Sequence, residues 1–176
     1  MISLTVLFWM YVIMFAMIGA MRGWAKEILV TSGVVLALFL INVMETYIPL
    51  VRENLTTESS FWVRLAVLIL MTFFAYQGPK LPRLIDSQKF VRDRFEDILL
   101  GGFIGGVNGY MIFGSAWYFL MVANYPFTWI SPPDVVTEAG QNALGLIEIL
   151  PPQWLQPPLI YIAVAISFVF VFVVII

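Results

Sequence analysis

The chain has 176 residues, of which 61% are hydrophobic and only 11% are charged, and its formal net charge is −2. Soluble domains carry about 25% charged residues, so this composition excludes an ordinary soluble fold. A weakly acidic chain also gives no basis for a nucleic-acid partner. Because cysteine and histidine are both absent, disulfides, thiolate chemistry and imidazole ligation of a metal or haem are excluded. We therefore expect no cofactor and no metal site.

Long uncharged stretches divide the chain. A spanning helix needs about 20 apolar residues. The third uncharged stretch, residues 65–79, reaches that length only if Arg64 snorkels to the interface. No basic residue precedes the first stretch, so we interpret it as a retained helix and not as a signal peptide. The sequence predicts an all-α, polytopic transmembrane helical bundle. Residues 1–123 form a four-span domain, residues 124–157 an outer loop and residues 158–176 a fifth span; the four core spans lie near 2–21, 28–48, 61–79 and 98–123.

The first connection, between the spans near 2–21 and 28–48, is very short. It contains Gly19, Arg22, Gly23 and Glu27, and glycine permits a tight reversal of the chain. One interpretation is a hinge or ligand site built around Arg22. The other is a plain cytoplasmic turn in which the charge of Glu27 suits the start of the second helix.

Basic residues set the predicted orientation. The connections after the first and third spans face the same side of the membrane, and the positive-inside rule makes that side cytoplasmic. The N-terminus is then outside and the C-terminus in the cytoplasm. Seven of the nine Lys and Arg residues lie in these two connections: Arg22, Lys26, Lys80, Arg83, Lys89, Arg92 and Arg94. The segment from Lys80 to Asp97 is either an interfacial linker or a docking surface for a partner.

A glycine zipper opens the fourth span. Spacing by four residues places its glycines on one helix face, where a second helix can approach to backbone contact. In a water-soluble helix each glycine would cost about 1 kcal/mol relative to alanine. The sequence leaves open whether the first span or another protein fills this face. The predicted helix-packing residues are Gly101, Gly105 and Gly109, with Gly102 and Gly106 beside them.

Asn108 is the one amide inside the fourth span. A polar amide in lipid normally faces a neighbouring helix and forms a hydrogen bond with it. Asn108 is therefore either a packing residue beside the glycine face or part of a binding site or pathway.

The outer loop contains a second predicted helix. Ser131 followed by Pro132-Pro133 and Asp134 is typical of a helix start, and Pro151-Pro152 would end the helix. Val135, Ala139, Leu146 and Leu150 share its apolar side. We expect this helix to lie on the outer face, where that side binds either the membrane surface or a partner protein.

Two segments together resemble the colicin V production protein family. One is Gly19-x-x-Arg22-Gly23-x-x-x-Glu27, and the other is Asp97 followed by glycine at 101, 105 and 109. The resemblance covers residues 1 to about 122 and implies an integral protein of the bacterial inner membrane that is linked to toxin production, secretion or envelope function. The chain departs from the family pattern at Asn108, where members favour arginine, and in its outer loop and fifth span.

The functional expectation is a non-enzymatic protein, because neither a nucleophile motif nor a phosphate-binding loop is present. The first hypothesis is a small scaffold or accessory protein that acts by helix packing, with membrane lipids, other membrane subunits or a second copy as partners. One variant is a non-catalytic subunit of a respiratory or photosynthetic complex. The alternative is an oligomeric transport or export component.

Overall fold

The computed structural model describes residues 3–49, 51, 57–77 and 94–175, and this part of the chain is all-α. The long helices follow the long apolar stretches, because in a bilayer only a helix satisfies its own backbone polar groups. In chain order the helices are α1 (Leu4–Arg22), α2 (Trp24–Tyr47), α4 (Thr57–Tyr76), α6 (Arg94–Val122), α7 (Glu138–Glu148), α8 (Pro151–Trp154) and α9 (Leu159–Ile175).

Four of these helices, α1, α2, α4 and α6, are long and apolar enough to cross a membrane. The prediction of four core spans in an all-α bundle is therefore confirmed. Three of these helices begin four residues before the predicted spans: α2 at Trp24, α4 at Thr57 and α6 at Arg94. The reversal needs only Gly23 between α1 and α2, so Lys26 and Glu27 belong to the helix rather than to a loop.

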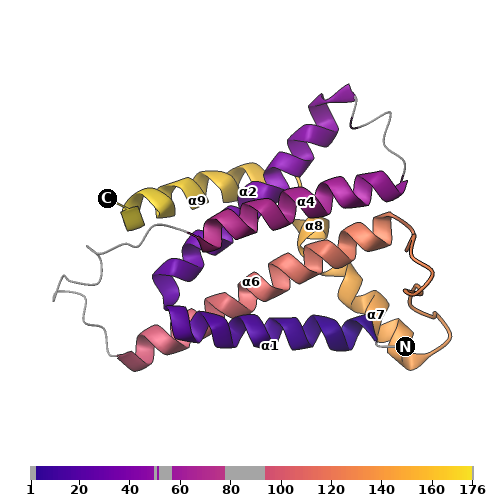
Figure 1. The fold of residues 1–176 in the computed structure, drawn as a ribbon, viewed down its shortest axis with the longest axis horizontal. Helices are drawn as coiled ribbons and strands as arrows, with labels where there is room; N and C mark the ends of the chain where they lie inside the picture. Colours follow the sequence, from indigo (N-terminus) through magenta and orange to yellow (C-terminus); the bar gives the residue numbers. More distant parts are fainter. Residues whose placement is uncertain (1–2, 50, 52–56, 78–93, 176) are drawn as a thin grey trace.

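Helices α6 and α2 make the main contacts of the bundle. Helix α1 packs along α6, while α2 packs against α4, α6 and α9. Figure 1 shows α1 and α6 side by side, with the N-terminus at one end of the molecule and the C-terminus at the other. The α1–α2 reversal lies at the same end as the C-terminus. A chain that crosses the membrane an odd number of times has its two termini at opposite ends in this manner.

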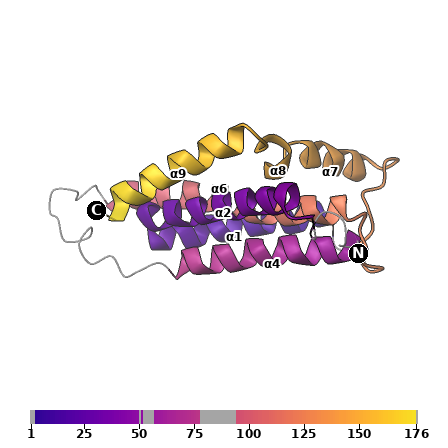
Figure 2. The ribbon, with the colours of Figure 1, turned by 90° about the horizontal axis from the view of Figure 1, so that it is seen from above.

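The segment α7–α8–α9 runs along one face of the bundle (Figure 2). Helix α9 has 17 residues and is strongly apolar, which is about the lower limit for a crossing. Its helical character agrees with the expected fifth span, and the crossing itself stays a prediction.

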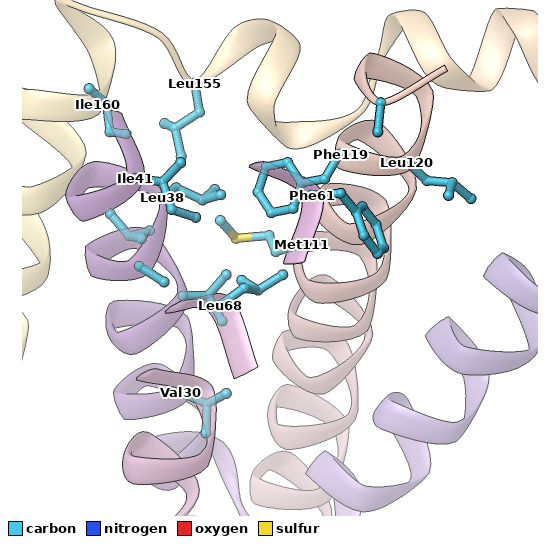
Figure 3. Close-up of a cluster of buried hydrophobic side chains, with 14 residues drawn as sticks. Val30, Leu38, Ile41, Phe61, Leu68, Met111, Phe119, Leu120, Leu155 and Ile160 are labelled. Carbon is cyan, nitrogen blue, oxygen red and sulfur yellow. The ribbon is translucent and has the colours of Figure 1, made fainter. Parts of the chain in front are cut away.

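The core lies where α2, α4 and α6 meet. Buried side chains from α2 (Leu38 and Ile41) point toward Met111 of α6, and Leu155 and Ile160 of the C-terminal segment lie against the same cluster (Figure 3). Large apolar side chains also cover the outside of α1 and α4. An apolar exterior around a close-packed interior is what a lipid environment requires.

Candidate functional site

The glycine face of α6 is filled by α1 of the same chain. A Cβ atom on Gly19 would lie 2.7 Å from the Cα of Gly105, and a Cβ on Gly105 would lie 2.9 Å from the Cα of Gly19. A Cβ on Gly101 would lie 3.1 Å from the Cα of Gly23. The two backbones therefore touch, which answers the question of which helix covers the face.

The other zipper glycines differ in how tightly they pack. A Cβ on Gly109 would lie 2.8 Å from the Cβ of Phe15, which is too close. At Gly102 and Gly106 the nearest atoms belong to Ala16 or Ala20 and would be at least 3.5 Å away, an ordinary contact distance. Gly101, Gly105 and Gly109 thus form the contact itself, and Gly102 and Gly106 lie at its edge.

The connection between α1 and α2 around Gly23, called the inner turn from here on, is joined to the start of α6. Gly23 has φ +86°, a conformation that side chains disfavour, and a Cβ there would lie 2.9 Å from a carboxylate oxygen of Asp97. The backbone N–H of Trp24 donates a hydrogen bond of 3.3 Å to Asp97 Oδ1. A carboxylate at the N-terminus of α2 also suits the helix dipole. The two segments that carry the family resemblance thus meet in space.

Glu27 is the most buried charged residue of the described chain. Its side chain is 0% exposed, and its Oε1 accepts a 3.0 Å bond from Nη1 of Arg22, whose side chain is 24% exposed. The Arg22 guanidinium lies 4.2 Å from the ring centroid of Tyr76 and donates to the Tyr76 carbonyl oxygen at 3.3 Å. The pair therefore links α1 and α2 to the end of α4.

Asn108 connects this pair to α6. Its Nδ2 donates to Oε2 of Glu27 at 2.9 Å and to the Glu27 carbonyl oxygen at 3.0 Å. Its Oδ1 accepts a 2.7 Å bond from the hydroxyl of Thr31. The amide is fully buried, and each of these three hydrogen bonds joins it to α2. A buried polar group with partners of this kind fixes one helix relative to another.

Sequence reasoning named Glu27 but missed its burial. The signal was present, because Glu27 falls in register with Val30, Val34, Leu38 and Ile41, which are all buried along one face of α2. It also missed Gly33, where a Cβ would lie 2.5 Å from the Cβ of Ala75 on α4. Gly33 stands alone in the sequence and has no repeat to reveal it.

The helix of the outer loop differs from the expectation in its start and in part of its buried face. Helix α7 begins after Thr137, whose side chain accepts a bond from the Gly140 N–H, and not near Ser131. Its buried face comprises Gly140, Ala143 and Ile147, whereas Val135 and Ala139 are exposed. Val135 precedes the helix, whose N-cap Thr137 lies six positions after Ser131, while Leu146 and Leu150 of the predicted side do pack against the bundle.

The apolar side of α7 binds its own bundle. Leu150 and Ile147 pack with Phe8 of α1 and Trp117 of α6, and a Cβ on Gly114 would lie 2.8 Å from Cδ of Pro151. The hydroxyl of Tyr110 donates to the carbonyl oxygen of Ile149 and accepts a 3.0 Å bond from Nε1 of Trp154. Leu146 and Leu150 of the side that was expected to bind the membrane or a partner are therefore covered from within the chain, whereas Val135 and Ala139 stay exposed.

Glu45 and Arg64 form an ion pair between α2 and α4 at the end away from the inner turn. The basic connector from Lys80 to Arg92 lies outside the described residues. Within the described ranges, the best-formed hollows are small; one of about 30 Å³ lies between α2 and α9 beside Ser32 and Ser167. Among those same residues no acidic cluster could hold a metal ion.

Comparisons with known protein families, with curated proteins and with solved structures find no match to this chain.

Proposed function

We propose that this chain is a small, non-catalytic scaffold or accessory protein of a bacterial inner membrane, related to the colicin V production proteins. The observation that carries the proposal is the filled interior. Helices α1 and α6 touch at their backbones, and two hollows among the described residues, one beside Arg64 and one beside Ser32, hold little more than water. The outer surface is then the part that can act on something else.

The outer surface suits binding inside the membrane. Exposed apolar side chains on α4 include Ile69, Leu70, Phe73 and Phe74. Lipid tails solvate such a face, and a neighbouring transmembrane helix can replace them at little cost. The same surface would serve a subunit of a respiratory or photosynthetic assembly.

The proposal is tested by gentle detergent extraction from membranes at native expression, followed by native mass measurement. We expect the chain to leave the membrane with larger, foreign subunits or as a defined assembly with itself. A chain that is recovered only as a monomer would contradict the scaffold function.

A transport or export component is the second candidate, favoured by the Arg22–Glu27 pair inside the bundle. Ionisable residues within spans often mark pathways. With so few spans, the pathway would have to form between copies. A homo-oligomer that supports solute flux in liposomes would establish this candidate and overturn the scaffold one.

A further inference from the structure

The two members of the Arg22–Glu27 pair differ in their access to water. The Glu27 side chain is fully buried, whereas that of Arg22 is 24% exposed at the C-terminal end of α1. Arg22 can turn toward water on its long side chain. Glu27 cannot follow, and an unpaired buried carboxylate is costly enough that such a group takes up a proton instead.

The Tyr76 hydroxyl offers a partner for that proton. It lies within electrostatic range of both the Arg22 and Glu27 side chains, but it is buried and has no hydrogen-bond partner among the described residues. A phenolic oxygen accepts hydrogen bonds as well as donating them. The Tyr76 hydroxyl can donate to the ionised carboxylate and accept from the protonated one, so it can be a partner of Glu27 in either state.

We propose that Glu27 is a proton-binding site, at which a bound proton replaces Arg22 as the partner of the carboxylate. One proton from water on the side of the inner turn forms an O–H bond at Oε1, the oxygen that Arg22 releases. The neutral acid donates to the Tyr76 hydroxyl, while Asn108 keeps its bond to Oε2. The added positive charge resides on Arg22, which has turned into water. No oxidant or further reactant is needed.

Few titratable groups of the described residues face the Glu27 carboxylate. Among the residues that the structure describes, the titratable groups that face it are Arg22 from α1 and Tyr76 from α4. From α6 the amide of Asn108 faces it, while Asp97 is turned to the Trp24 N–H at the start of α2. On α2 itself, Lys26 is exposed. The proton-linked step would loosen the contact of α1 and α2 with α4.

The test is infrared difference spectroscopy of the purified full chain in liposomes while the pH is lowered. We expect a carbonyl band of a protonated carboxylic acid that Glu27→Gln removes, since glutamine keeps the size and polarity of the site. Tyr76→Phe should retain this band but shift its frequency, because the acid loses its acceptor.

Glu45→Gln is the matched control, because Glu45 is the other glutamate paired with an arginine between two helices. It should leave the Glu27 band in place. Circular dichroism of each variant checks that the helices are retained. If a folded Glu27→Gln protein gives the same titrating spectrum as the wild type, Glu27 binds no proton and the proposal fails.

Discussion

On α6, the space for an added methyl group differs sharply between the neighbouring residues Gly105 and Gly106. Gly105 touches the backbone of α1, where no side chain can move aside. Gly106, the next residue, has ordinary space around its Cβ position beside Ala16. The same glycine-to-alanine change thus tests the helix contact at one position and serves as its own control at the other.

We predict that Gly105→Ala destabilises the folded protein by about 1–3 kcal/mol, because the added methyl group forces the two helices apart. Gly106→Ala should be neutral or stabilising by up to about 1 kcal/mol, since alanine favours the helix. Reversible unfolding in mixed detergent micelles measures both. Equal stability of the two variants would contradict backbone contact at Gly105.

Asn108 matters because it satisfies a charge that cannot reach water. Replacing it with leucine removes the donor to Glu27 Oε2, and we expect a loss of about 1–3 kcal/mol in the free energy of unfolding. Asn142→Leu on the exposed side of α7 is the control and should stay within about 0.5 kcal/mol. A stable Asn108→Leu protein in the same unfolding measurement would mean that the amide is dispensable.

At the scale of elements, the docking of α7 and α8 depends on Gly114. We predict that Gly114→Val displaces this segment, because a side chain there meets Pro151 and Leu150. The chain has no cysteine, so a single Ala143→Cys substitution reports on the buried face of α7 through its rate of maleimide labelling. Labelling should be slow in the parent background and several-fold faster with Gly114→Val.

Gly145→Cys provides the reference for that experiment. Its Cβ position has nothing within 4 Å, so labelling should be fast in both backgrounds. If Gly114→Val leaves the labelling rate of Ala143→Cys unchanged, α7 does not depend on this contact.

At the scale of the whole molecule, the charge distribution predicts the orientation in the membrane. A cysteine at Val136, which is 83% exposed on the outer loop, should react with a membrane-impermeant maleimide added to whole cells. A cysteine at Met21, which is 88% exposed at the inner turn, should react only after the cells are opened. The reverse pattern would invert the proposed topology.

The fifth crossing has a test of the same kind. A cysteine added after Ile176 should behave like Met21→Cys if α9 crosses the membrane. Labelling of that cysteine from outside would mean that the chain crosses four times and that α9 lies against the bundle without passing through.

The number and type of the main helices could be predicted from the apolar stretches alone, because such a stretch in a bilayer has no alternative to the helix. The sequence also identified the glycines at 101, 105 and 109 through their spacing. Boundaries at polar residues were less certain: Lys26 and Glu27 suggested a loop, yet both lie in α2.

Which helix surfaces meet could not be predicted before the packed fold was known. Periodicity shows that a helix has a small-residue face or an apolar face, but any complementary surface can cover it. The fold places α1 on the glycine face and the bundle under α7. It also converts Glu27 from an apparent surface charge into a buried partner of Arg22 and Asn108, because those residues come from three helices that approach one another only when packed.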